Sequence, residues 1–254
     1  MKYYFRYRYD KDIQFNLSTK VHLSIIGNSN DFIIDTLLNG NEKCNIFVDD
    51  KELNEENMAT IRKRMSIVLN RHINIFVGET VMDEIAFGLE SLAMSKDDIL
   101  TAIMTESRRF KLDELLERDP NSLGSSDKVK MKILSSLIIK PDIIVIDNVL
   151  SELDYIDKLL VFDILDEYKK NGGIVLNLTN DIEETLYSDK IIIVHDKKLV
   201  CEGKTLSVLN EEKILKRLGI GLPFMVELNK YFMDYGMIDK YQLTNEKLVG
   251  ALWK

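Results

Sequence analysis

The chain opens with two short segments in which apolar and polar residues alternate. Residues 3–9 (YYFRYRY) and 13–17 (IQFNL) carry apolar side chains two positions apart. A period of two is typical of half-buried antiparallel strands. A third short strand is predicted over residues 23–26, ending at Gly27. Apolar residues then recur at helical spacing over residues 32–38, and the Asn-Gly pair that follows is a typical helix end.

Two later segments are apolar almost throughout. Residues 143–147 (IIVID) and 174–178 (IVLNL) are rich in β-branched side chains. This pattern predicts strands that are covered on both faces, as in a parallel sheet. The stretch 154–170 between them is amphipathic and predicts a helix, which completes a strand–helix–strand unit. Residues 191–194 and 199–201 predict a hairpin at the edge of that sheet.

The segment 82–139 is predicted to be mostly helical. Ser95, followed three residues later by Asp98, resembles the start of a capped helix. A second helix is predicted to begin near residues 125–126 and to end before Pro141.

The composition narrows the class of protein. The chain has 254 residues, 34 basic and 42 acidic side chains, a formal charge of −8 and 45% hydrophobic residues. This length and apolar content suit one or two globular domains. The acidic balance argues against a nucleic-acid partner, which would call for a basic surface.

Targeting and redox features point to an intracellular location. No apolar run exceeds four residues, and the first twenty residues lack the apolar centre of a signal peptide. Cys44 and Cys201 form no CxxC pair, and a disulfide between them is not expected in an intracellular protein. We therefore expect a soluble, intracellular α/β protein.

A strand that ends at Gly27 and leads into a helix is the context of a phosphate-binding loop. In the pattern GxxxxGK[ST], glycines let backbone amides surround the phosphates and the lysine neutralises them. Counted from Gly27, the second glycine would fall at Phe32 and the lysine at Ile33, and neither residue type is present. Between Gly27 and Gly40 there is no further glycine, lysine or arginine, and Asp31 lies where the helix is expected to begin. A carboxylate there would cap the helix itself and repel a phosphate.

The chain resembles the ATP-binding subunits of energy-coupling-factor (ECF) transporters, which belong to the ATP-binding-cassette (ABC) superfamily. The matching segments follow the order of the family's motifs and span nearly the whole chain. Residues 76–90 (FVGETVMDEIAFGLE), Leu222-Pro223-Phe224 and residues 244–253 carry the resemblance that is specific to the ECF branch. Other segments of the chain resemble further motifs of the family. They are 122–130 (the signature), 140–148 (the Walker B strand), 151–154 (the D-loop), 178–181 (the switch), and the segments 188–191 and 202–203.

The resemblance implies a fold and a division of the chain. It implies an α/β ABC-type nucleotide-binding domain over residues 1–205, with an N-terminal antiparallel β layer, a mostly parallel core sheet and a helical subdomain at about 82–139. Residues 206–254 would form a C-terminal helical extension, and helical spacing over 224–233 agrees with this.

The resemblance also implies a function and partners. The family binds ATP and Mg²⁺ and drives uptake of vitamins or metal ions. The chain would form a heterodimer with a second ATP-binding subunit on a transmembrane scaffold subunit, and through it would serve a substrate-binding membrane subunit. Its expected location is the cytoplasmic face of the cell membrane, as a peripheral subunit.

Several positions that carry chemistry in the family differ in this chain. Asn148 stands at the catalytic glutamate position, and an amide cannot act as the general base, which contributes about 10²–10⁴-fold to rate. Asn180 stands at the switch histidine, and Asn70 at the Q-loop glutamine. We therefore expect no functional catalytic residue in the chain's own site.

The resemblance assigns further positions to nucleotide and magnesium. These are Gly27, Asn28, Ser29, Tyr7, Asn70 and Asp147 in the chain's own degenerate site, with Asp147 as an indirect Mg²⁺ position; Leu123, Gly124, Ser125 and Ser126 facing the partner's ATP; and Asp154 in the D-loop. Simpler interpretations stay open for some of them: a helix cap for Asp147, plain N-cap serines at 125–126, and ordinary packing for the aromatic ring at Tyr7 or Tyr9.

Three functions follow from these observations. The first is a degenerate ATP-binding-type subunit that supports a transporter as a catalytically impaired partner. The second is an active ATPase with a nonstandard site, in which Lys20 or Arg71 neutralises the phosphates. The third is an interaction module that kept the fold and left transport. A chromosome-maintenance ABC ATPase does not fit, because the chain has no long heptad insertion and is acidic.

Overall fold

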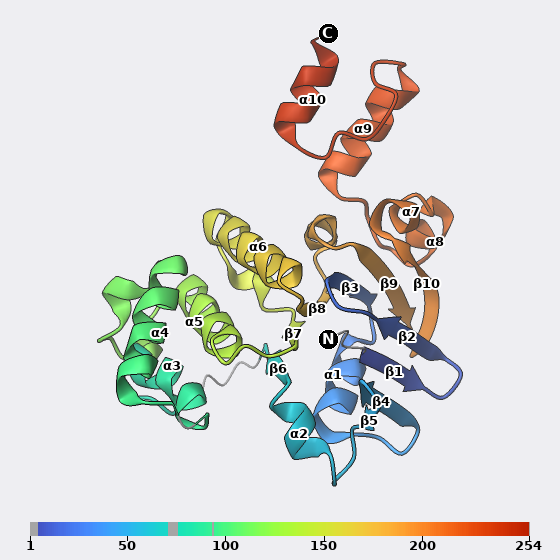
Figure 1. Ribbon diagram of the computed structural model, residues 1–254. Coiled ribbons are helices and arrows are strands. Elements are labelled where there is room, and N and C mark those ends of the chain that lie inside the picture. The colour runs from blue at the N-terminus through green and yellow to red at the C-terminus, as the bar shows by residue number, and fades with distance from the viewer. Residues whose placement is uncertain (1–4, 71–75, 93, 254) are drawn as a thin grey trace.

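The computed structural model describes residues 5–70, 76–92 and 94–253, and two β-sheets form its centre (Figure 1). The strands are β1 Phe5–Tyr9, β2 Ile13–Leu17, β3 Val21–Gly27, β4 Cys44–Val48, β5 Lys51–Glu52, β6 Met65–Val68, β7 Ile143–Asp147, β8 Ile174–Thr179, β9 Lys190–His195 and β10 Lys198–Lys204. The α-helices are α1 Asn30–Asn39, α2 Met58–Arg62, α3 Val81–Glu90, α4 Lys96–Arg109, α5 Ser125–Leu137, α6 Tyr155–Lys170, α7 Thr205–Leu209, α8 Glu212–Arg217, α9 Phe224–Asp234 and α10 Asn245–Leu252. Short 3₁₀ turns lie at Asp113–Leu115, Pro120–Ser122, Leu150–Glu152 and Ile182–Tyr187.

The smaller sheet is antiparallel, with strand order β2-β1-β4-β5. In β1, Phe5 and Tyr7 are buried while Arg6 and Arg8 are exposed, so the alternation in the sequence is the alternation of the two sheet faces. The predicted pair of N-terminal strands is confirmed from Phe5 onwards, and residues 3–4 lie outside the described residues.

The larger sheet has strand order β10-β9-β3-β8-β7-β6 and is parallel except at β10. The predicted unit of β7, α6 and β8 is confirmed, and every residue of β8 is buried. Alternate residues of β7 belong to different cores: Ile143 and Val145 face the small sheet, whereas Ile144 and Ile146 face the helices. The hairpin β9–β10 at the edge is also as predicted.

Helices complete the layers on both sides of the large sheet. Figure 1 shows α3, α4 and α5 beside α6 on one side of it, and the small sheet with α1 on the other. Both predicted helices of the 82–139 segment are confirmed, and the side chain of Ser95 accepts a hydrogen bond from the backbone of Asp98. The expected helices at α1 and α9 are present as well.

The C-terminal region packs against β9. Ile191 and Ile193 of this strand share a core with Val208, Leu215 and Val226 from α7, α8 and α9. Figure 1 shows α9 and α10 extending beyond α7 and α8. Cys44 and Cys201 are free thiols. Within the described residues, no helix has the length and apolar character that a membrane crossing requires.

His22 in β3 makes the stability of this fold sensitive to acid. The side chain is 2% exposed, its Nε2 has no hydrogen-bond partner, and burial lowers its pKa to about 4. Because this value lies below the ordinary pKa of about 6.5, neutral His22 favours the folded state above pH 6.5, and that contribution is lost as the pH falls toward 4. Urea unfolding at pH 7 and at about pH 4.5 should show a loss of roughly 2 to 3 kcal/mol from this group. The variant His22→Gln should lose correspondingly less between the two pH values, and parallel behaviour of the two proteins would contradict this assignment.

Candidate functional site

The predicted site residues meet at the carboxyl edge of the large sheet. Gly27 ends β3, Asn148 follows β7 and Asn180 follows β8. These three strands are neighbours in parallel register, with Ile26 opposite Thr179 and Asp147 opposite Leu178. This edge is where α/β sheets bind ligands. The structure therefore brings these three predicted segments together at one edge of the sheet.

The segment from β3 to α1 is too short to surround a phosphate. Only Asn28 and Ser29 separate Gly27 from the first residue of the helix. Phe32 and Ile33, where a second glycine and a lysine would be needed, already lie inside α1, and the side chain of Ile33 is fully buried. The backbone amides that would contact phosphates in a wider loop are instead part of the helix.

The polar side chains of this turn are bonded to the turn between β9 and β10. Asn28 donates from Nδ2 to Oδ1 of Asp196 at 2.8 Å and accepts at Oδ1 from the backbone amide of Asp196, also at 2.8 Å. Ser29 Oγ accepts from the backbone amide of Lys197 at 2.9 Å. We name these four residues the Asn28–Asp196 latch. The latch therefore engages the side chains of both residues of this turn.

The carboxylates nearest the latch oppose a triphosphate. Asp31 lies exposed in the first turn of α1, and the carboxylate of Asp196 is 77% exposed. The ammonium of Lys197 lies over the ring of Phe32, 4.6 Å from its centre. The expectation that Asp31 occupies the start of the helix needs a correction, because α1 begins at Asn30 and Ser29 is the N-cap residue, without a side-chain cap. Asp31 remains in the first turn, where its negative charge interacts favourably with the positive end of the helix dipole.

One of the two cations suggested for a nonstandard site, Lys20, lies far from this edge. Lys20 immediately precedes β3 and so lies at its amino end, roughly 20 Å from Gly27 for a strand of this length. That suggestion is therefore wrong. Arg71 lies outside the described residues.

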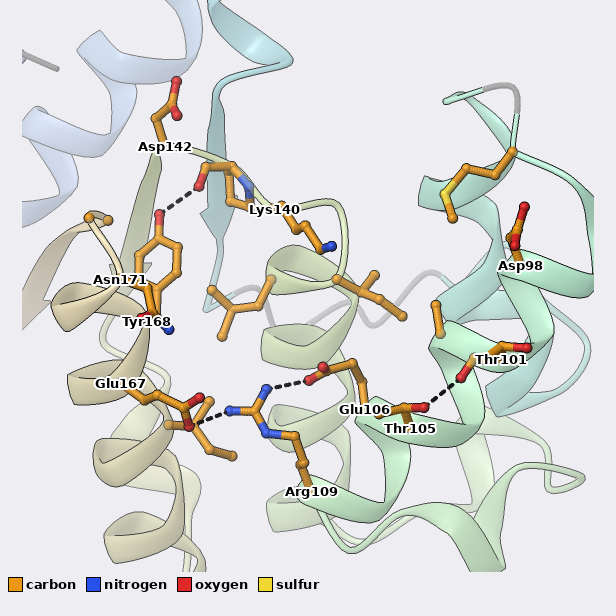
Figure 2. A pocket seen from close by; sticks show the side chains of 18 residues that line it. Asp98, Thr101, Thr105, Glu106, Arg109, Lys140, Asp142, Glu167, Tyr168 and Asn171 are labelled. Carbon is orange, nitrogen blue, oxygen red and sulfur yellow. Dashed lines mark hydrogen bonds and ion pairs between the residues drawn. The ribbon is translucent and has the colours of Figure 1, made fainter. Parts of the chain in front are cut away.

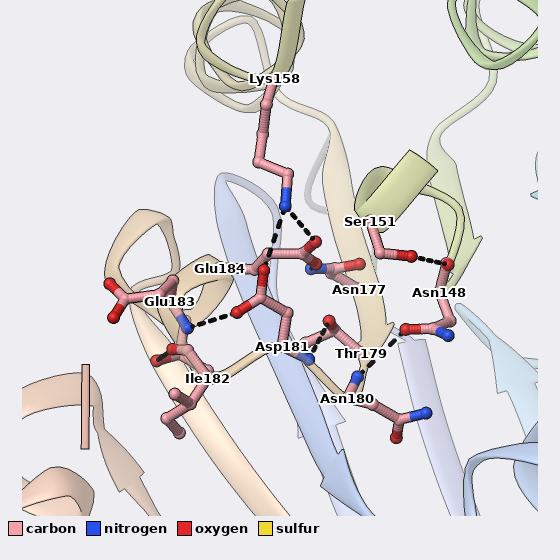
Figure 3. Close-up of polar contacts among 11 residues, drawn as sticks. Asn148, Ser151, Lys158, Asn177, Thr179, Asn180, Asp181, Ile182, Glu183 and Glu184 are labelled. Carbon is pink, nitrogen blue, oxygen red and sulfur yellow. Dashed lines mark hydrogen bonds and ion pairs between the residues drawn. The ribbon is translucent and has the colours of Figure 1, made fainter. Parts of the chain in front are cut away.

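Asn148 and its neighbours form a hydrogen-bonded group (Figure 3). The side-chain Oδ1 of Asn148 accepts from the backbone amide of Asn180 at 3.2 Å. The backbone carbonyl of Asn148 accepts from Asn70 Nδ2 at 3.2 Å and from Ser151 Oγ at 3.0 Å. All these contacts are structural, and an amide in this place has no proton-accepting role.

The switch segment is also held on its other side. Figure 3 shows the ammonium of Lys158 between the carboxylates of Asp181 and Glu184, at 3.1 and 3.2 Å. Glu184 is 1% exposed and accepts a second hydrogen bond from Asn177 Nδ2. Burial opposes the charge of Lys158, but the two carboxylates hold its pKa above the ordinary value.

The predicted signature segment begins α5 and is fixed to α6. Gly124 is the N-cap residue, so the interpretation of Ser125 or Ser126 as a plain N-cap is wrong. Ser126 Oγ donates instead to Asp157 Oδ2 at 2.6 Å, and Lys130 Nζ lies 3.0 Å from the same oxygen. Leu123 is buried, whereas Gly124 and Ser125 remain exposed.

Asp154 acts as the cap of α6. Its carboxylate accepts from the backbone amide of Asp157 at 2.9 Å. A side chain in this role fixes the turn that precedes the helix.

The adenine-stacking prediction for Tyr7 is wrong. The side chain is 1% exposed, its ring stacks on Phe15, and its hydroxyl is hydrogen-bonded to Thr36 at 2.8 Å. Tyr7 therefore belongs to the core and has no free ring face. Tyr9 is half-buried and packs edge-on against Phe32.

A separate cavity of about 710 Å³ lies between α4, the end of α5 and α6 (Figure 2). Its wall includes residues 140–142, just before β7, and Arg109, which is bonded to Glu106 and Glu167 at 2.7 and 2.8 Å. None of the predicted site residues lines this cavity.

Comparison with known proteins decides the family. A scan against models of protein families finds no match. The energy-coupling factor transporter ATP-binding protein EcfA1 of Bacillus subtilis is 30% identical in an alignment that covers 98% of this chain and 93% of that protein. The chain belongs to this family. EcfA1 of Mycoplasmopsis synoviae is 31% identical over 214 residues, or 84% of this chain and 79% of that protein.

Solved structures agree with the ABC fold of this ECF family member. The structure of cbiO1 from Clostridium perfringens, part of the ABC transporter complex cbiONQ, covers 91% of this chain and 100% of its own, with a TM-score of 0.73 and 18% identity. A dimeric bacterial ABC transporter cassette gives a TM-score of 0.72 over 79% of this chain and 98% of its own, also at 18% identity. The predicted fold class is confirmed.

The sequence did not predict that Asp196, Lys197 and Lys158 contact the predicted site segments at the carboxyl edge of the large sheet. Asp196 and Lys197 carry the signal of a tight turn, but nothing in the sequence pairs them with Asn28, 168 residues away. The role of Lys158 was likewise not visible, because an exposed-helix lysine and one that pairs with a buried carboxylate have the same sequence signal.

Proposed function

We propose that this chain is a structural partner subunit of an ECF transporter, in which its own nucleotide site is closed. One observation carries the proposal: the turn after Gly27 has two residues, and both of their side chains are bonded to Asp196 and Lys197. Asn148 and Asn180 at the catalytic and switch positions support it, because neither can move a proton from water. Bound ATP and Mg²⁺ therefore do not fit the chain's own site.

The proposed complex contains a second ATP-binding subunit. That subunit would supply an intact phosphate loop opposite the segment 123–127 of this chain, where Gly124 and Ser125 are exposed at the start of α5. We also propose a membrane scaffold and a substrate-binding membrane subunit that take up vitamins or metal ions, with this chain peripheral on the cytoplasmic face. Residues 1–205 would be the cassette and 206–254 the helical extension.

Thermal unfolding of the isolated chain with MgATP tests the closed site. At about 1 mM, a ligand with a Kd of roughly 10 µM stabilises a protein by about 2.7 kcal/mol, which raises Tm by roughly 5 to 10 °C at this size. We expect a shift below about 1 °C here and no magnesium-dependent hydrolysis. EcfA1 of Bacillus subtilis, prepared in the same way, is the matched control.

The alternatives predict different results. A rise of several degrees with MgATP, together with turnover that Asp147→Ala abolishes, would show an active nonstandard site. Failure of the chain to co-purify with an ATPase subunit and a membrane subunit would instead show an interaction module outside transport.

A further inference from the structure

Asn148 has a backbone conformation that restricts the residue types it tolerates. Its φ is 48°, in the left-handed region, where asparagine is among the favoured residues and longer side chains are strained. Its amide donates to the carbonyl of Leu178 at 2.8 Å, which fixes this conformation against β8.

Three separate segments are bonded to this one residue. The segment after β6 reaches its carbonyl through Asn70, and the turn before α6 reaches the same carbonyl through Ser151. The segment after β8 reaches its side chain through the amide of Asn180. The positions joined in this way lie 78, 3 and 32 residues from Asn148 in the sequence.

The segment after β8 is held from two sides. Asn148 binds the amide of Asn180, and the next residue, Asp181, is paired with Lys158 of α6. Asp181 also accepts from the amide of Glu183 at 3.0 Å and so starts the following turn. These bonds are all made between residues of the chain itself.

We propose that Asn148 is a positioning residue that holds the segments at Asn70, Ser151 and Asn180 in one arrangement through bonds of the chain itself. The backbone carbonyl of residue 148, in its left-handed conformation, accepts hydrogen bonds from two of the segments. The Oδ1 atom serves the third, so the side chain has a role separate from that of the backbone. This role goes beyond the closed nucleotide site and does not depend on it.

Amide hydrogen exchange of the full chain, measured residue by residue by NMR, separates the two contributions. Asn148→Gly keeps the left-handed backbone and removes Oδ1, whereas Asn148→Asp keeps both. We expect the amide of Asn180 to exchange about fivefold faster in the glycine variant, the effect of one net hydrogen bond, and at the wild-type rate in the aspartate variant. Ser151→Ala is the matched control, because it removes a donor to the carbonyl and should leave the exchange of Asn180 unchanged.

Two results would overturn the proposal. One is wild-type exchange of Asn180 in Asn148→Gly; the other is equally fast exchange in Asn148→Asp. Repeating the measurement with MgATP separates this role from the closed site. If ATP raises Tm but Asn180 still exchanges faster in Asn148→Gly than in Asn148→Asp, only the proposal of a closed nucleotide site is wrong. If the amide of Asn180 is protected only when ATP is present, the positioning role of Asn148 is wrong.

Discussion

Replacing Gly27 with alanine is expected to lower the free energy of unfolding by about 4 kcal/mol or to prevent folding. The residue has φ = 140°, which L side chains rarely adopt. A Cβ atom placed on it would lie 1.7 Å from the carbonyl oxygen of Val194 and 2.8 Å from its carbonyl carbon. Both atoms belong to the backbone of β9, which pairs with β3 at this point, so the strand itself would have to move.

Urea unfolding and soluble yield measure this effect, with Gly250→Ala as the control. Gly250 lies inside α10, and a Cβ there would meet no atom within 4 Å, so alanine should be neutral or slightly stabilising. A loss of about 4 kcal/mol corresponds to roughly 10 °C in Tm at this chain length. A Gly27→Ala protein within about 1 kcal/mol of wild type would show that β9 can yield at Val194.

The result bears on how the glycine of a phosphate loop is interpreted. In this chain Gly27 is required by the contact between β3 and β9, whether or not a nucleotide binds. The presence of a glycine at the end of this strand is therefore no evidence for a working site.

The sequence was sufficient for the parts of the fold that repeat a strong pattern. The apolar runs of β7 and β8 predicted strands with two covered faces, and alternate residues of β7 indeed lie in two different cores. The amphipathic period of α6 was equally clear. Between α1 and α3 no element was predicted: β5 has two residues, β6 has four and α2 has five, and β4, although as long as β1, was missed as well. The two- and four-residue strands carry too little periodicity to be recognised.

The sequence predicted which residues of a phosphate-binding site are missing, but not which contacts are made in their place. Missing glycine and lysine residues are visible locally, whereas the bond between Asn28 and Asp196 joins residues 168 positions apart. The adenine-stacking prediction for Tyr7 was wrong for the same reason, because only the packing of β1 against α1 shows that its hydroxyl reaches Thr36. Residues that meet through the fold have no common sequence signal.

Lys158→Met is expected to destabilise the chain by about 3 kcal/mol, because it leaves the buried carboxylate of Glu184 without its cation. The lysine is 21% exposed, and Glu184 is 1% exposed. The removal would also release Asp181, which Lys158 binds at 3.1 Å, and so would weaken the segment after β8. The raised pKa of Lys158 means that its contribution is complete below its ordinary pKa of about 10.5 and is lost at higher pH, so measurements at pH 7 report it in full.

A double-mutant cycle in urea unfolding identifies the cause. Adding Glu184→Gln to Lys158→Met removes the unpaired charge, and we expect it to restore about half or more of the lost stability. Lys170→Met is the matched control, because Lys170 is 71% exposed and pairs with Asp166 at the surface of the same helix; its loss should stay within about 0.5 kcal/mol. If the double variant is no more stable than Lys158→Met, the lysine acts through packing of its aliphatic stem, and the ion pair with Glu184 is not what holds this segment in place.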